Sequence, residues 1–114
     1  MNYLAIIQSS LIYFFGNLIV WFQLNGQFKW EYWKDNVLVI GLLGVPISIA
    51  FWYATKLSYI GFDGVLWPGR LIAFGLSMIS FTMCTWIFLG ETLTLKTIIS
   101  LILAIIIVLI QLVK

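Results

Sequence analysis

The chain has 114 residues, of which 63% are hydrophobic and 9% are charged, and its formal net charge is +2. A soluble domain of this size carries about a quarter charged residues, and it has too little interior to hide this much apolar surface from water. The composition therefore excludes a separate soluble domain and predicts an integral membrane protein whose main partner is the lipid bilayer. The few scattered basic residues argue against a nucleic-acid partner.

Four apolar runs have the length of membrane-spanning helices. They cover residues 3–24, 37–55, 66–89 and 93–113, and about 20 apolar residues are needed to cross the hydrocarbon core. Backbone groups in lipid must bond internally, and the runs do not alternate as strands would. We therefore predict an all-α membrane protein, a four-transmembrane-helix bundle, with a single transmembrane domain over residues 1–114.

The first run carries Asn17 at its deepest point, beside Gly16, which permits another helix to approach closely. Amides in lipid usually bond across helices, so an interhelical hydrogen bond is the favoured interpretation of Asn17, and substrate contact is the alternative. The run contains no carboxylate. Because no basic region precedes it and no small-residue cleavage site follows it, we predict a retained helix and not a signal peptide.

The first connection, residues 25–36, interleaves aromatic and charged residues, which is the composition of a membrane interface. An anchoring belt is the favoured interpretation, and a substrate-gating loop is the alternative. In the second run, Pro46 is expected to free a backbone carbonyl and bend the helix. Later in the chain, Thr92 or Thr94 is expected to cap the fourth helix.

Three polar or amphipathic residues lie where the third run begins: Asp63, Trp67 and Arg70. An arginine inside a span is a functional candidate by default, so Arg70 is predicted either to contact an anion in a cavity or to reach the lipid headgroups from the first helical turn. Asp63 precedes Arg70 by about 10 Å along a helix axis. It is interpreted as a helix cap, with a proton or cation site as the alternative, and Trp67 as part of an aromatic belt or a cavity wall.

Three connections between four helices place both termini on one side of the membrane. Each side then carries three basic residues, so the distribution predicts no preferred orientation. They are Lys56, Arg70 and Lys114 on the side of the termini, and Lys29, Lys34 and Lys96 on the other. A chain that inserts both ways can form an antiparallel dimer, and a partner that orients the chain is the alternative explanation.

The sequence lacks the residues of a catalytic centre. It has no histidine, no clustered metal ligands and no glycine-rich phosphate loop, and its single cysteine, Cys84, lies within an apolar run. These absences predict that the chain is not an enzyme and needs no cofactor or metal.

Two stretches resemble the small multidrug resistance family, within the drug/metabolite transporter superfamily. The first contains Ala54-Thr55-Lys56, Ile60-Gly61, Trp67 and Gly69, and the second is Phe88-Leu89-Gly90-Glu91-Thr92-Leu93-Thr94. The resemblance covers the second half of the chain, and the first half is similar only in topology. It implies a dimer with a central cavity and alternating access.

The sequence also departs from that family. The family's exporters use a membrane-embedded glutamate in helix one, and the matching stretch here is Tyr13-Phe14-Phe15-Gly16-Asn17. Proton-coupled cation export is therefore not implied. Arg70 falls where the family has an uncharged residue, the stretch from Trp67 to Glu91 is longer than usual, and the fourth run lacks the family's glycine pattern. The sequence is thus similar to a divergent member.

Together, these features predict a small transporter-like protein that moves a small or lipid-linked solute by alternating access as a homodimer or paired small subunit. An arginine near the headgroups suits a phosphate-bearing substrate. The alternatives are a non-transporting subunit packed against a larger partner and a cation or drug exporter. The candidate substrate-binding residues are Asn17, Trp67, Arg70 and Asp63, and the expected location is the cell (inner) membrane.

Overall fold

The computed structural model describes residues 1–113, and four of its helical segments are long and apolar enough to cross a membrane. They are Tyr3–Phe28, Val37–Gly61, Trp67–Leu89 and Leu95–Leu112. No strand occurs within residues 1–113. The predicted all-α, four-span fold class is confirmed, and the chain is a multi-pass integral membrane protein. Lys114, which entered the charge balance, lies outside the described residues.

The elements follow one another with short connections. In chain order they are α1 (Tyr3–Asn25), η1 (Gly26–Phe28), α2 (Glu31–Asp35), α3 (Val37–Gly41), α4 (Gly44–Gly61), α5 (Trp67–Cys84), the π-helical η2 (Thr85–Leu89) and α6 (Leu95–Leu112). The second span ends at Gly61 and not near residue 55 as expected. The charge of Lys56 does not end the helix, because its long side chain is exposed and places Nζ 5.8 Å from the ring centroid of Trp52.

The predicted effect of Pro46 is confirmed in the second span. Leu42 and Leu43 form a turn that separates α3 from α4. Pro46 has no N–H to donate to the Leu42 carbonyl four residues earlier, and its ring crowds that carbonyl. The carbonyl instead accepts from the Val45 N–H at 3.2 Å. The second span is therefore a discontinuous helix.

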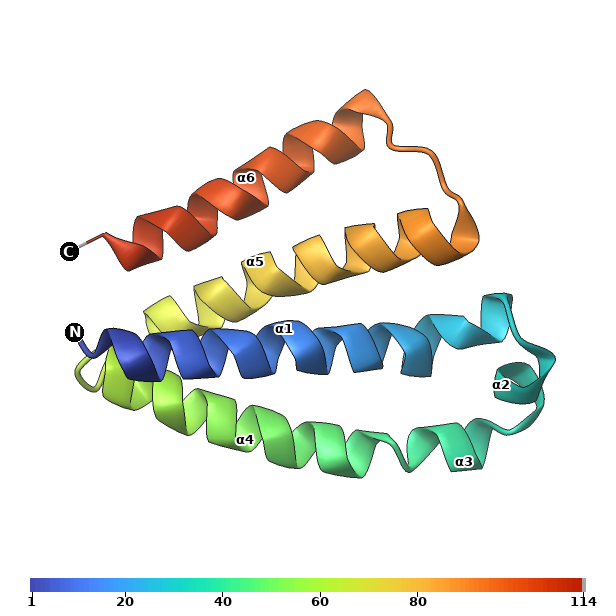
Figure 1. Ribbon diagram of the computed structural model, residues 1–114, viewed down its shortest axis with the longest axis horizontal. Helices are drawn as coiled ribbons and strands as arrows, with labels where there is room; N and C mark the ends of the chain where they lie inside the picture. Colours follow the sequence, from blue (N-terminus) through green and yellow to red (C-terminus); the bar gives the residue numbers. More distant parts are fainter. Residues whose placement is uncertain (114) are drawn as a thin grey trace.

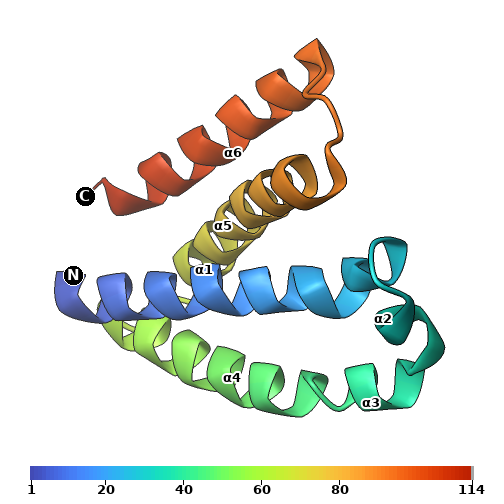
Figure 2. The ribbon, with the colours of Figure 1, turned by 45° about the vertical axis from the view of Figure 1, so that its right-hand side comes forward.

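The four spans form an open, flat array (Figure 1). Helix α1 packs against both α4 and α5, α6 packs against α5, and both termini lie at the same end. The array is 17 Å thick, against 46 and 36 Å in the other two directions. In Figure 1, α6 diverges from α5 towards the Gly90–Thr94 connection, and Figure 2 shows α6 as the outermost span, beside α5 and away from α4. One chain therefore leaves broad apolar faces uncovered by protein.

Glycines allow two of the helix contacts to be close. A Cβ on Gly16 would lie 2.5 Å from the ring of Phe51. The close contact between α1 and α4 at this point therefore depends on glycine having no side chain. A Cβ on Gly75 would meet Val108 and would lie 3.0 Å from the backbone oxygen of Ala104. Ala104 is the only buried residue of α6. The contact at Gly75 is therefore the centre of α6 packing.

Polar side chains connect the spans at the end opposite the termini. The Trp21 Nε1–H donates to Thr85 Oγ1 at 2.9 Å, and both residues are buried. Lys29 Nζ donates to the Phe88 carbonyl at 3.0 Å and lies over the ring of Phe88. A lysine at the last carbonyls of a helix satisfies backbone groups that have no helical partner. The first connection is thereby tied to the end of the third span.

The start of α6 agrees with one of the two predicted caps. Thr94 is the N-cap residue, and its hydroxyl accepts a hydrogen bond from the Thr97 N–H at 3.2 Å. Gly90 ends the third span in the left-handed conformation, with φ of 67°, which favours glycine. Thr92 lies between these two residues and caps no helix.

Candidate binding cavity between helices α1, α4 and α5

A cavity lies where α4 and α5 diverge from their common turn, and α1 forms part of its wall. Its volume is about 710 Å³. Figure 1 shows α4 and α5 meeting at the end that holds the termini and separating towards the other end. The lining residues are Tyr13 and Asn17 from α1, Phe51, Thr55 and Ser58 from α4, and Leu66, Trp67, Arg70, Ala73, Phe74 and Ser77 from α5 and the residue before it.

Three of the four predicted site residues meet in this cavity. Asn17, Trp67 and Arg70 all line it, although Asn17 is 50 residues or more from the other two in sequence. Asp63 does not line the cavity, and 73% of its side chain is exposed. Its Oδ2 lies 3.0 Å from the N-terminal amine. The structure thus places Asp63 apart from the other predicted site residues.

Asp63 is a helix cap, as its favoured interpretation predicted, but the backbone makes the cap. The residue adopts the left-handed conformation, with φ of 57°, just after α4. The Gly64 N–H then donates to the Tyr59 carbonyl at 2.9 Å, and the Asp63 N–H donates to the Ile60 carbonyl at 3.3 Å. These two bonds satisfy the last carbonyls of α4 in the Schellman pattern. The exposed carboxylate does not provide a cavity site for a cation.

Arg70 lies near the start of α5 and also lines the cavity, so its position is compatible with each of its two predicted roles. It is the fourth residue of α5, about 5 Å along the axis from Trp67, so it lies close to the end of the span. It also lines the cavity, and its side chain has no hydrogen bond or ion pair with any residue in 1–113. Pro68 in the first turn fixes the start of the helix. The guanidinium is therefore available to a ligand at the outer end of the cavity.

The cavity extends from the membrane interface towards the middle of the spans. Ser77 is two helical turns beyond Arg70, about 10 Å deeper along α5. Asn17 is about 21 Å from the start of α1 at Tyr3, in a span of 26 residues. A ligand can thus place one end at headgroup depth and the other near the bilayer centre.

Hydrogen bonds within the cavity wall determine which polar atoms a ligand meets. The Thr55 hydroxyl donates to the Phe51 carbonyl at 2.8 Å, so it accepts from the Tyr13 hydroxyl at 3.0 Å. The Tyr13 oxygen keeps its lone pairs. Asn17 Nδ2 donates to the Tyr13 carbonyl at 2.7 Å. No interhelical bond of Asn17 occurs within residues 1–113, so that prediction is wrong for the single chain: Nδ2 bonds a carbonyl of its own helix, and Oδ1 has no bond there.

Ser77 adds a hydroxyl at the deep end of the cavity. Within the described residues it makes no hydrogen bond, unlike Ser58 and Ser80, which donate to carbonyls of their own helices. Sequence reasoning missed Ser77, Tyr13 and Thr55 as lining residues. The available signal was helical spacing, since Tyr13 precedes Asn17 by four residues and Ser77 follows Arg70 by seven.

The charge of the cavity is positive and its walls are mainly apolar. Arg70 is the only charged residue among those that line it, and no carboxylate of residues 1–113 is among them. Tyr13, Phe51, Trp67 and Phe74 supply aromatic surface. A few fixed polar groups in an apolar pocket are typical of small-molecule sites. This arrangement can bind an anionic group at the interface and an apolar group below it.

Comparison with known proteins adds no further identification. The chain matches no protein-family model, no curated protein and no solved structure.

Proposed function

We propose that this chain is a small membrane transporter that binds a phosphate-bearing or otherwise anionic solute with an apolar portion, including a lipid-linked solute. The observation that carries the proposal is the cavity in which Arg70 is the only charged residue among aromatic walls. A guanidinium binds phosphate through two parallel hydrogen bonds, and this one has no protein partner in residues 1–113. The proposal assigns the chain no catalytic step and no cofactor.

The same cavity argues against cation export. Proton-coupled export of cations needs a carboxylate that binds the proton and the substrate in turn, and none of the described carboxylates lines the cavity. The proposed protein is thus a divergent relative of the small multidrug resistance family, similar in architecture and different in substrate charge. We place it in the cell (inner) membrane.

The discontinuous second span supports transport by alternating access. Broken helices in membrane proteins line binding sites and move during transport. The turn at Leu42 and Leu43 separates α3 from α4, whose residues Phe51 and Thr55 form one wall of the cavity. Rotation about this turn would move that wall relative to α1.

Two probes with the same decyl chain and opposite charges test the proposal. The purified chain in lipid nanodiscs is titrated with radiolabelled decyl phosphate and, separately, with decyltrimethylammonium. We expect decyl phosphate to bind at least about tenfold more tightly, since one charge-assisted contact contributes about 1.5–3 kcal/mol. Proteoliposomes loaded with decyl phosphate should also release it faster than protein-free vesicles. Tighter binding of the ammonium probe would overturn the proposal in favour of a cation exporter.

The open face of the cavity supports a dimer. Phe74 and Trp67 line the cavity and are more than half exposed in one chain. A second copy that covers this face would enclose the solute, as the resemblance to the transporter family implies. The balanced basic residues permit the second copy to insert in either orientation.

Cysteine cross-linking in membranes tests the dimer. In a background where Cys84 is replaced by Ser, Phe74→Cys is expected to form a disulfide between two chains. Leu11→Cys is the matched control, because Leu11 is similarly exposed but lies on the α1 face opposite the buried Ser9. Cross-linking at Leu11 and none at Phe74 would show that the cavity face is not the dimer interface.

Helix α6 favours a second candidate function, that of a subunit within a larger membrane complex. Only Ala104 of α6 is buried, and the helix diverges from α5 at one end (Figure 1). A larger partner would cover the remaining apolar surface of α6. This function predicts that neither cysteine variant cross-links to a second copy and that neither decyl probe is bound.

A further inference from the structure

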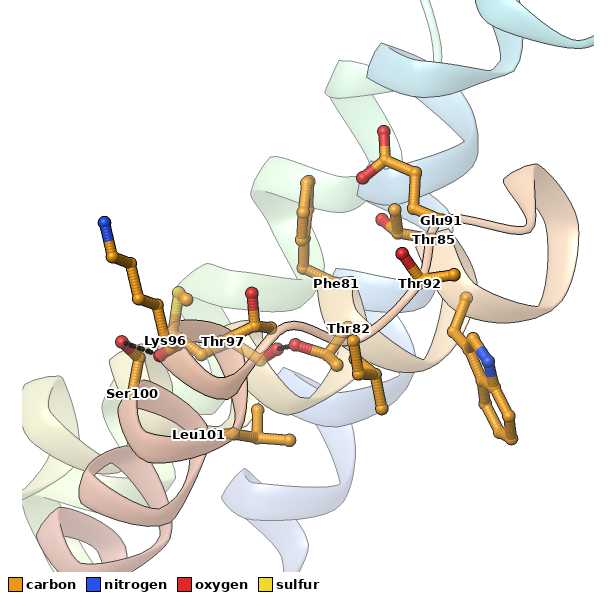
Figure 3. A pocket seen from close by; sticks show the side chains of 12 residues that line it. Phe81, Thr82, Thr85, Glu91, Thr92, Lys96, Thr97, Ser100 and Leu101 are labelled. Atoms are coloured by element: carbon orange, nitrogen blue, oxygen red, sulfur yellow. Dashed lines mark hydrogen bonds between the residues drawn. The ribbon is translucent and has the colours of Figure 1, made fainter.

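A second pocket lies between α5–η2 and α6, at the end of the molecule opposite the termini. Its volume is about 330 Å³, and Figure 3 shows the side chains that line it. Its rim contains Glu91 and Lys96 together with the hydroxyls of Thr92 and Thr97. None of these residues lines the cavity between α1, α4 and α5 that contains Arg70. The pocket is a separate site that the proposed transport function does not use.

The depth of this pocket spans the boundary between headgroups and acyl chains. Its rim lies where the third span ends at Leu89 and the fourth begins at Leu95. Its inner wall contains Leu101, about 9 Å along α6 from Leu95, and Met78, about 16 Å along the third span from Leu89. Because α6 diverges from α5 towards this end (Figure 1), the pocket lies between two apolar spans.

The two charges of the rim are opposite in sign and have no protein partners. Neither Glu91 nor Lys96 makes a side-chain hydrogen bond or an ion pair within residues 1–113. Figure 3 shows Glu91 beside Thr85 and Thr92, and Lys96 on the other side of the pocket, with Thr97 between the two charges. A ligand that carries both a positive and a negative group can pair with both residues.

A buried hydroxyl supplies a further unpaired donor. Thr85 is 7% exposed and lines the pocket, and its Oγ1 accepts the Trp21 N–H at 2.9 Å. Its own hydroxyl proton has no acceptor within the described residues. Thr82 and Ser100, by contrast, donate to carbonyls of their own helices. A buried O–H that donates no hydrogen bond costs free energy unless a ligand supplies an acceptor.

We propose that this pocket binds a zwitterionic phospholipid with a primary ammonium, such as phosphatidylethanolamine. The phosphate lies beside Lys96 and the Thr97 hydroxyl, and the ammonium donates to the Glu91 carboxylate. The acyl chains continue past Met78 and Leu101 into the groove between α5 and α6. An anionic lipid would satisfy Lys96 but would leave Glu91 unpaired beside the headgroup, and the quaternary ammonium of phosphatidylcholine cannot donate a hydrogen bond.

Lipid retention by the full chain tests this site. Protein purified from mixed micelles with equal amounts of phosphatidylethanolamine, phosphatidylcholine and phosphatidylglycerol is examined by native mass spectrometry. We expect phosphatidylethanolamine to be retained about fivefold over phosphatidylglycerol. Glu91→Gln should abolish this preference, and Lys96→Gln should lower retention of both lipids. The controls are Glu31→Gln and Lys34→Gln, exposed charges on α2 outside the pocket, which should change neither quantity.

Two results would overturn the proposal. One is a preference for phosphatidylethanolamine that Glu91→Gln leaves unchanged while the protein keeps its helical circular dichroism spectrum. The other is displacement of the lipid by soluble phosphoethanolamine at equal concentration, which would show a site for the free zwitterion. Because Glu91 and Lys96 are exposed and unpaired in the protein, both substitutions should leave folding intact.

Discussion

Replacing Arg70 with glutamine is expected to lower the affinity of the chain for decyl phosphate by about ten- to a hundredfold. Glutamine keeps much of the side-chain length and removes the positive charge that would contact the phosphate. Binding of decyltrimethylammonium should not fall, because the cavity loses a repulsive charge. Equilibrium binding in nanodiscs measures both effects.

Two further variants show whether direct contact with Arg70 or the general surface charge causes the expected loss of decyl phosphate affinity. Arg70→Lys keeps the charge but loses the planar fork, so its affinity for decyl phosphate should fall between those of the wild type and Arg70→Gln. Lys56→Gln removes the same charge near the same end of the molecule from a residue outside the cavity. If Lys56→Gln and Arg70→Gln weaken binding equally, the effect is one of surface potential, and Arg70 is not a binding residue.

The sequence was sufficient to predict the residues at the two ends of the cavity. Arg70 is a charge within an apolar run, and Asn17 is an amide deep within another. Placing either side chain in the bilayer costs free energy, which makes each a candidate for a functional residue. Their proximity depends on which faces α1 and α5 present to each other, and with little amphipathic contrast in such apolar helices, composition does not reveal these faces. The Tyr13, Thr55 and Ser77 hydroxyls were missed for the same reason.

The spans were predictable to within a few residues except at the end of the second. Length and hydropathy predict where lipid can surround a helix, and a lysine lowers the hydropathy and so ends the predicted span. They do not show that the lysine side chain can extend along the helix to the interface, as Lys56 does beside Trp52. Asp63 shows a different limit. Its capping role was predicted, but the sequence does not distinguish a cap made by the carboxylate from one made by the left-handed backbone.

Substituting Gly75 with leucine is expected to have the largest effect on stability. The new side chain would meet Val108 and the backbone oxygen of Ala104, and a backbone atom cannot move aside as a side-chain end can. Helix α6 must shift away from α5, because Gly75 faces the only buried residue of α6. Overpacking costs about 1–3 kcal/mol, so the free energy of unfolding measured by titration with sodium dodecyl sulfate should fall by that amount or more.

Gly41→Leu is the matched control for this prediction. It is the same substitution in another span, but a Cβ at Gly41 meets no atom within 4 Å, so its free energy of unfolding should stay close to the wild-type value. A cysteine at Ala104 in the Cys84→Ser background gives an independent measurement. It should react with a thiol reagent faster when Gly75 is leucine, since the buried face of α6 is then exposed. Equal destabilisation by both glycine substitutions, with unchanged thiol reactivity, would mean that the added side-chain bulk acts wherever it is placed and that the α5–α6 contact does not determine the loss.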